Sequence, residues 1–238
     1  MIQINELHKK FGKNEVLGGV DLEIPQGGIS AVLGPNGSGK TTLIKCILGM
    51  VIPNSGSIEA CGQPTKKDWK YRQQINYLPQ IANFPSNLKV AELISMIQDL
   101  RQKPSDADRL IALFELKPFL DKKLGALSGG TKQKVNIVLA FMFDSPLLML
   151  DEPTTGLDPA ALIQLKKLIR SEKEKGKTIL ITSHIMSFVE EVADEIVYLL
   201  EGNIHFKGSL EDLKSITLGT SLEEAITRLT TKEQLHDA

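Results

Sequence analysis

The chain has 238 residues, which is enough for one large domain or for a core with a smaller appendage, since domains commonly hold about 150 residues. Its composition, 42% hydrophobic and 24% charged, is typical of a globular protein and excludes disordered and collagen-like classes. A formal net charge of -1 gives no global basis for binding nucleic acid, and two cysteines cannot form a disulfide framework. We therefore expect a globular protein of a reducing compartment, without a nucleic-acid partner.

No stretch of the sequence predicts a membrane span or a signal peptide. The longest uninterrupted apolar run, residues 137–143, is far shorter than the ~18 residues that a spanning helix needs. The first residues alternate apolar Ile2 and Ile4 with polar neighbours and lack the apolar block of a signal peptide. We expect a cytoplasmic protein that reaches the inner face of the cell membrane only through a partner.

Alternating apolar residues bounded by glycine and proline predict the first strands, and further short strands are predicted before and after a helical segment. These strands are expected at residues 2–7, 16–24, 28–33, 56–60, 75–78, 147–150, 178–182, 195–200 and 203–207. Between residues 84 and 144 the apolar positions instead follow the 3.6-residue helical period. The pattern predicts an α/β fold with a parallel sheet, an N-terminal antiparallel β-subdomain and an inserted helical subdomain.

Three regions follow from this pattern. Residues 1–85 and 145–208 are predicted to form the core, residues 86–144 the helical subdomain, and residues 209–238 a short helical appendage. A helix is predicted at residues 159–175. The charged residues 172–177 are expected to form its solvated end, which Gly176 terminates.

A glycine-rich loop lies between the predicted strand at residues 28–33 and a predicted helix. It matches GxxxxGK[ST], and its residues are Gly34, Pro35, Asn36, Gly37, Ser38, Gly39, Lys40, Thr41 and Thr42. Such a loop turns successive N–H groups toward phosphate oxygens, and the helix adds its positive N-terminal end. We expect Lys40 to bridge the β- and γ-phosphates and the Thr41 hydroxyl to bind Mg²⁺. A glycine turn with an incidental lysine is the alternative, which the flanking strand and helix disfavour.

Two carboxylates, Asp151 and Glu152, end the apolar run at residues 147–150. Buried parallel strands deliver such acids to the carboxyl edge of a sheet, where sites of α/β proteins lie. We expect Asp151 to hold Mg²⁺ through its water shell and Glu152 to act as general base on the attacking water. Acids also end strands for structural reasons alone, so the pair depends on the phosphate loop for its interpretation.

A Ser-Gly-Gly turn, formed by Ser128, Gly129 and Gly130, precedes a predicted helix and offers a second N-terminal end for an anion. One nucleotide has no use for two such ends in one compact site. The turn therefore predicts contact with a nucleotide held by another subunit. A serine N-cap followed by a flexible glycine pair remains the alternative.

Taken in order, the motifs GPNGSGKTT, YLPQ, LSGG, LLMLDE, GLDP and SH resemble those of the nucleotide-binding subunit of ABC transporters. The resemblance covers residues 1 to about 215. It implies ATP and Mg²⁺ as cofactors, ATP hydrolysis, a homodimer and a separate integral membrane permease. One departure is Thr131, which stands where the family usually has glutamine.

The resemblance also implies roles for three residues to which the motifs alone assign none. Phe11 would stack on the adenine, with a core aromatic as the alternative. Gln80 would reach Mg²⁺ and the water while sensing the permease, with an ordinary loop amide as the alternative. His184 would hold the γ-phosphate and Glu152 in place, with a capping or packing histidine as the alternative.

Across the expected dimer, Ser128, Gly129 and Gly130 would contact the γ-phosphate, and Asp158 would link the two sites. Short matches, LSGGTKQKV among them, are also similar to ATPase subunits of the Nos-type ABC complex, which supports copper-site maturation of nitrous oxide reductase. The resemblance thus implies a motor for a membrane permease, and the Nos-type similarity implies one for copper or sulfur delivery. An ABC ATPase of a soluble assembly or repair complex is the alternative function.

Overall fold

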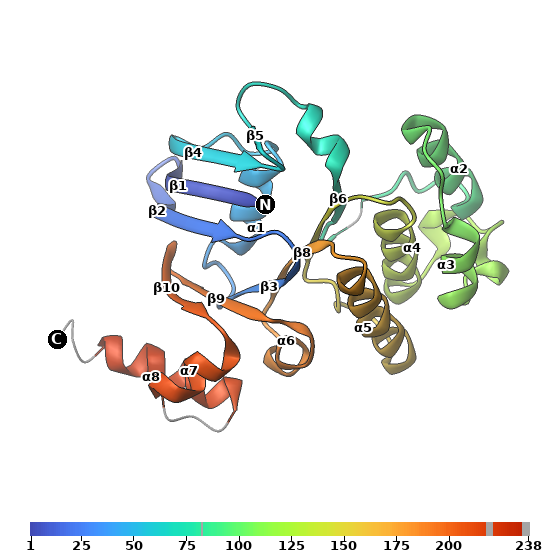
Figure 1. Ribbon diagram of the computed structural model, residues 1–238. Helices are drawn as coiled ribbons and strands as arrows, with labels where there is room; N and C mark the ends of the chain where they lie inside the picture. The colour runs from blue at the N-terminus through green and yellow to red at the C-terminus, as the bar shows by residue number, and fades with distance from the viewer. Residues whose placement is uncertain (82, 218–220, 235–238) are drawn as a thin grey trace. The chain divides into compact units, whose positions relative to one another are not determined.

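The computed structural model describes residues 1–81, 83–217 and 221–234 (Figure 1). Two compact units share the chain: Met1–Trp69 with Leu180–Ala238, and Lys70–Ile179. The predicted helical insertion at residues 86–144 lies inside the second unit. Residues 218–220 and 235–238 of the predicted appendage lie outside the described residues. None of the described helices has the length and apolar character required to cross a membrane.

An antiparallel sheet opens the first unit, with strand order β2-β1-β4-β5. Its strands are β1 (Ile2–Phe11), β2 (Asn14–Ile24), β4 (Ser55–Ala60) and β5 (Gln63–Pro64). β1 and β2 pair as a hairpin in which Ile2 faces Ile24. The alternating residues Ile2 and Ile4 are buried, which is why period-two spacing predicted this hairpin. The two-residue strand β5 was not predicted, because it is too short for a period to show.

A second set of strands in this unit carries the glycine-rich loop. β3 (Gly28–Leu33) runs parallel to β9 (Glu195–Leu200), and β9 pairs antiparallel with β10 (Asn203–Gly208). The last five residues of β3 are buried, as expected for a central strand. The chain leaves β3 through the loop and enters helix α1 (Lys40–Ile47).

The strand β8 (Thr178–Ser183) begins in one unit and ends in the other. After it, three helices are described in the first unit. They are α6 (Met186–Val192), α7 (Leu210–Thr217) and α8 (Leu222–Gln234). α8 packs against α6 and α7, and its residues Leu222 and Ala225 are fully buried. Lys214 of α7 forms an ion pair with Glu190 of α6 at 2.6 Å. The C-terminal helices are therefore packed on the first unit.

In its described residues, the second unit combines the parallel strand pair β6 (Ile75–Leu78) and β7 (Leu147–Asp151) with four α-helices. β6 pairs with β7 so that Leu78 faces Leu150. The helices are α2 (Val90–Arg101), α3 (Ala107–Leu113), α4 (Gly129–Phe141) and α5 (Pro159–Glu174). The 3.6-residue period predicted the helical character of the segment between β6 and β7, and short 3-10 turns connect its helices.

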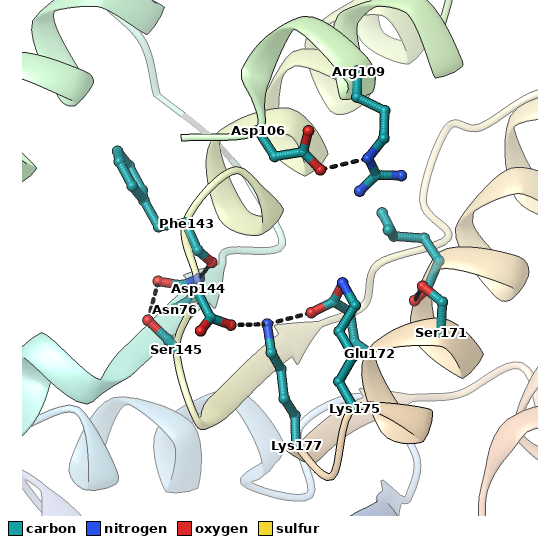
Figure 2. A network of polar contacts seen from close by, with 11 residues as sticks. Asn76, Asp106, Arg109, Phe143, Asp144, Ser145, Ser171, Glu172, Lys175 and Lys177 are labelled. Carbon is teal, nitrogen blue, oxygen red and sulfur yellow. Dashed lines mark hydrogen bonds and ion pairs between the residues drawn. The ribbon is translucent and has the colours of Figure 1, made fainter. Parts of the chain in front are cut away.

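The charged segment at residues 172–177 is a solvated helix end only in part: residues 174–176 are exposed, as expected, but the two end residues of the segment are buried. Glu172 is only 3% exposed and Lys177 only 8%. Lys177 contacts the Glu172 carboxylate and lies 2.7 Å from the Asp144 carboxylate, while Lys175 lies 2.7 Å from Glu172 (Figure 2). For Lys177 the expectation failed because its partner Asp144 is distant in sequence. Gly176, with a φ of 79°, does end the helical segment as expected.

Candidate functional site

The glycine-rich loop curls at the end of β3 because its glycines allow close contacts that other residues would not. A Cβ on Gly34 would lie 2.1 Å from the Leu199 carbonyl oxygen, and one on Gly39 would lie 2.8 Å from that of Val16. Gly39 also has a φ of 106°, which side-chain-bearing residues rarely adopt. The backbone thus reaches the first turn of α1 along a path that requires glycine.

The polar atoms of this loop fit a polyphosphate. Lys40 is 6% exposed, and its Nζ donates to the carbonyl oxygens of Gly34 at 2.7 Å and Pro35 at 3.0 Å. The Ser38 hydroxyl is buried and has no hydrogen-bond partner among the described residues. A buried polar atom without a partner carries a free-energy penalty that a bound ligand can remove. The loop is therefore a ready anion site at the N-terminus of an eight-residue helix.

Phe11 and His184 also belong to the first unit. The Phe11 ring is 51% exposed at the end of β1, which excludes its interpretation as a core aromatic. The Lys9 ammonium lies 4.7 Å from the centre of this ring. His184 is exposed in the turn between β8 and α6, where the Ser183 hydroxyl accepts a hydrogen bond from the Ile185 N–H at 3.0 Å.

Asp151 and Glu152 stand where β7 ends in the second unit, and both are buried, at 1% and 3% exposure. Glu152 has a φ of 49°, a left-handed conformation that costs a residue with a side chain about 1 kcal/mol or more. Such strain gathers at functional sites, where the surrounding structure enforces it. The bend turns the chain sharply between the two carboxylates.

Tyr77 of β6 is a neighbour of Asp151 that the sequence did not assign. Burial, the nearby Asp151 charge and a hydrogen bond to Asp151 together raise the pKa of the Tyr77 hydroxyl well above its usual value. The tyrosine therefore stays protonated and donates to the carboxylate. Tyr77 belongs to the motif YLPQ, in which the sequence predicted a role for the glutamine only.

Gln80 is exposed and follows Pro79, directly after β6. The Pro79 carbonyl accepts a hydrogen bond at 2.9 Å from Nδ2 of Asn136 on α4. The same Nδ2 donates to Oε1 of Gln133 at 3.4 Å, and Nε2 of Gln133 donates to the Pro153 carbonyl at 3.1 Å. Two side chains of one helix thus contact the loops that carry Gln80 and Glu152.

The turn before α4 has the serine N-cap geometry that the sequence left open as the alternative interpretation. The Ser128 hydroxyl accepts a hydrogen bond from the Thr131 N–H at 3.3 Å and shares a second one with the Thr131 hydroxyl at 2.8 Å. Ser128 and Gly129 are exposed. Thr131, the departure from the family pattern, therefore orients the Ser128 hydroxyl.

Gly130 and Gly156 make a close backbone contact in the same unit. A Cβ on Gly130 would lie 2.6 Å from the Gly156 carbonyl oxygen. Asp158, two residues later, caps α5 by accepting a hydrogen bond from the Ala161 N–H at 2.8 Å. The Ser-Gly-Gly turn is therefore adjacent to the Gly-Leu-Asp segment.

The predicted site residues are thus divided between the units. The first unit holds Phe11, the loop from Gly34 to Thr42, and His184, whereas the second holds Gln80, Ser128, Gly129, Gly130, Asp151, Glu152 and Asp158. Sequence reasoning missed Tyr77, Gln133 and Asn136. A signal was present for Asn136, since it interrupts the otherwise apolar run of residues 135–141.

Known proteins match this chain in sequence and structure. The family model described as ABC transporter matches residues 17–155. Nod factor export ATP-binding protein I of Burkholderia orbicola is 33% identical over 229 residues, which cover 94% of this chain and 75% of that protein.

Two solved structures extend the match to the fold. One, described as the structure of an ATP binding subunit of an ABC transporter, has a TM-score of 0.89 and 32% identity, and the match covers 97% of this chain and 99% of that one. The other, MJ0796 in a dimeric post-hydrolysis state bound to ADP and Pi, has a TM-score of 0.76 and 26% identity, with 88% and 99% covered. The chain therefore belongs to the ABC transporter family, as an ATP-binding subunit with ATPase activity.

Proposed function

We propose that this chain is the ATP-hydrolysing subunit that powers a separate membrane permease. The observation that carries the proposal is the glycine-rich loop. Its Lys40 is buried, and its buried Ser38 hydroxyl has no hydrogen-bond partner among the described residues, so a polyphosphate could bind there. ATP supplies that polyphosphate, and its hydrolysis is the chemistry of the family. Loop amides, together with Lys40, Thr41 and Thr42, would bind the phosphates.

The remaining roles follow from the motifs and the local geometry. Thr41, Asp151 and Gln80 would hold Mg²⁺, an oxygen-seeking cation that neutralises phosphate charge. Glu152 would take the proton from the attacking water, and His184 would position the γ-phosphate. Phe11, whose ring is half exposed, would stack on the adenine.

We assign the Ser128, Gly129 and Gly130 turn to the nucleotide of a second copy of the chain. Its exposed position at the N-terminus of α4 supports this assignment, because helix N–H groups there can reach an outside phosphate. MJ0796 forms a dimer in its solved structure. A homodimer of this chain would thus hold two shared sites, and Asp158 would connect them.

The permease would bind the ATPase near Gln80 and bring it to the membrane. Two experiments test the proposal. Purified protein should hydrolyse MgATP, and Lys40→Ala should abolish hydrolysis while the protein stays folded. The complex purified from its native membrane should contain an integral membrane subunit. Co-purification with soluble proteins alone would instead favour an assembly or repair complex.

Two cargo classes have support from specific observations. The LSGGTKQKV segment supports a Nos-type transporter in copper or sulfur delivery for nitrous oxide reductase. The 33% identity to a Nod factor export protein supports an exporter of another cargo. Deleting the gene and measuring copper loading of nitrous oxide reductase separates the two, since only a Nos-type role predicts a loss. Cys46 and Cys61 both have raised thiol pKa values from burial, so we expect other subunits to handle any metal.

A further inference from the structure

One helix face in the second unit joins two loops that the proposed mechanism uses. Gln133 and Asn136 are three residues apart on α4, which places them on the same face of the helix. Both are buried, at 6% and 3% exposure. A buried carboxamide is costly unless its donors and acceptors are satisfied, so these two side chains have a defined arrangement.

The hydrogen bonds form a continuous link, which we name the amide bridge: Pro79 carbonyl, Asn136, Gln133, Pro153 carbonyl. Pro79 precedes Gln80, and Pro153 follows Glu152. The loops leave the neighbouring parallel strands β6 and β7, whose register pairs Leu78 with Leu150. The bridge therefore fixes both loops to one side of one helix.

The same helix begins with the Ser-Gly-Gly turn. Gln133 lies about one helical turn after Ser128, and Asn136 about one turn further. The turn and the amide bridge are therefore both in the first part of one helix. The backbone bend at Glu152, with its φ of 49°, also needs outside support to persist, and the bridge anchors the next residue.

We propose that Gln133 and Asn136 are positioning residues that hold Gln80 and Glu152 of their own subunit in the geometry required for hydrolysis. The inference rests on the proposed function, because it assigns a consequence to the roles of Gln80 and Glu152. The proposal gives neither amide a contact with the nucleotide. Their effect is on the rate of hydrolysis, through the placement of the two loops, and not on the affinity for ATP.

The first test measures kcat and ATP affinity for the purified full chain. Asn136→Ala and Gln133→Ala should each lower kcat by about 10- to 100-fold, the range expected when a reacting group is displaced by up to an ångström. The Kd for ATP should stay within about twofold. Because the bridge acts as one unit, the double variant should lose no more than the worse single variant. Multiplied losses, or an unchanged kcat, would overturn the proposal.

Asn76 provides the matched control for a simple loss of folding. It is 3% exposed on β6, its Nδ2 donates to the Phe143 carbonyl at 2.7 Å, and its Oδ1 accepts from the Ser145 hydroxyl at 2.9 Å (Figure 2). Asn76→Ala should lower the unfolding temperature about as much as Asn136→Ala but leave kcat within about twofold. If both variants lose kcat in proportion to stability, the bridge is only structural.

A mixed dimer tests whether the effect stays within one subunit. Combining a Ser128→Arg subunit with a Lys40→Ala subunit leaves one complete site, which uses Glu152 of the former and the Ser-Gly-Gly turn of the latter. Asn136→Ala in the Ser128→Arg subunit should lower the rate by about 10-fold or more. The same Asn136→Ala substitution in the Lys40→Ala subunit should change the ATPase rate by less than about twofold. An equal loss of rate whichever subunit carries Asn136→Ala would overturn the proposal.

The two levels of inference fail in different ways. If the mixture of Ser128→Arg and Lys40→Ala subunits is inactive, the shared site is rejected. The kcat values of the Asn136→Ala and Gln133→Ala proteins, each measured alone against wild type, would still decide the role of the bridge. Wild-type protein without ATPase activity would reject the proposed function itself. Active wild type with a fully active Asn136→Ala variant would reject only the bridge.

Discussion

Lys134 forms an ion pair with Asp158, with 2.7 Å between Nζ and Oδ2. The hydrogen bond from Lys134, together with that from the Ala161 N–H, lowers the pKa of the Asp158 carboxyl below its usual range. Asp158 is at once the N-cap of α5 and the partner of a side chain on α4. The start of α5 and the first turns of α4 are therefore held together by this pair and by the close approach of Gly130 to Gly156.

Gly130→Ala should destabilise this junction. The new Cβ would lie 2.6 Å from a backbone oxygen, which cannot move aside as a flexible side chain would. We expect a loss of about 1–3 kcal/mol in the free energy of unfolding, as for other overpacked positions. Gly129→Ala is the control, since its Cβ meets nothing within 4 Å among the described residues. Urea unfolding of both variants measures the difference, and equal stabilities would refute the expectation.

Glu152→Gln should bind ATP but hydrolyse it about 10²- to 10⁴-fold more slowly, the loss expected for removal of a general base. The amide has nearly the same shape, so the buried position and its bent backbone should persist. Single-turnover hydrolysis and nucleotide binding, measured on the same preparation, separate the two effects. Near-normal turnover would reject Glu152 as the base.

Ser128→Arg should block hydrolysis only in the site of the partner subunit, because the turn serves the partner's nucleotide. Lys40→Ala should block only the subunit's own site. Each variant alone should be inactive, whereas mixing them should restore one competent site in each heterodimer. The ATPase rate of the mixture, with each variant alone as reference, is the measurement. No recovery would count against the shared site.

Lys177→Met should lower the free energy of unfolding by about 3 kcal/mol, because it removes a partner of the buried Glu172 carboxylate. Chemical denaturation at neutral pH measures this loss. Lys207→Met is a suitable control, since its ion pair with Glu195 is longer, at 3.6 Å, and more exposed. Equal effects of the two substitutions would show that burial of the pair is unimportant.

The same cluster gives a pH dependence of known sign. The hydrogen bond and charge of Lys177 lower the pKa of the Asp144 carboxyl below its usual range. The ionised Asp144 carboxylate therefore stabilises the folded state. This stabilisation is complete above the ordinary aspartate pKa of about 4, and it is lost as the pH falls through the lowered pKa of the folded state. Asp144→Asn should flatten this part of the acid unfolding curve, and an unaltered curve would exclude the contribution.

Cys46 should resist thiol reagents in the folded protein. Burial raises the pKa of its thiol to about 11, so about one molecule in a thousand carries the thiolate at pH 8. A Cys61→Ser variant, treated with a chromogenic disulfide, should react slowly in buffer and fully in denaturant. Rapid reaction of the folded variant would show that α1 opens readily.

The sequence predicted local features better than connections between distant residues. Period-two spacing identified β1 and β2, and the GxxxxGK[ST] pattern identified the loop before α1. Lys177 was misjudged, because nothing near it in the sequence indicates Asp144 as its partner.

The amide bridge shows the same limit within the candidate site. Gln133 and Asn136 lie on a single helix, but the carbonyls they bind are 20 and 57 residues away in sequence, respectively. A buried asparagine within an apolar run indicates that its side chain has a buried hydrogen-bond acceptor. Which carbonyl oxygen is that acceptor depends on the fold. The carboxylates Asp151 and Glu152 were identifiable because they end an apolar strand.

The packing of α8 bears on protein engineering. A minimal cassette truncated after Gly208 would strip Glu190 of its lysine partner and discard the apolar side chains of Leu222 and Ala225. Such a shortened protein should aggregate more readily at high concentration, because it exposes apolar surface that α8 covers in the full chain. Crystallisation trials and fusion designs are better served by keeping the polypeptide through Gln234.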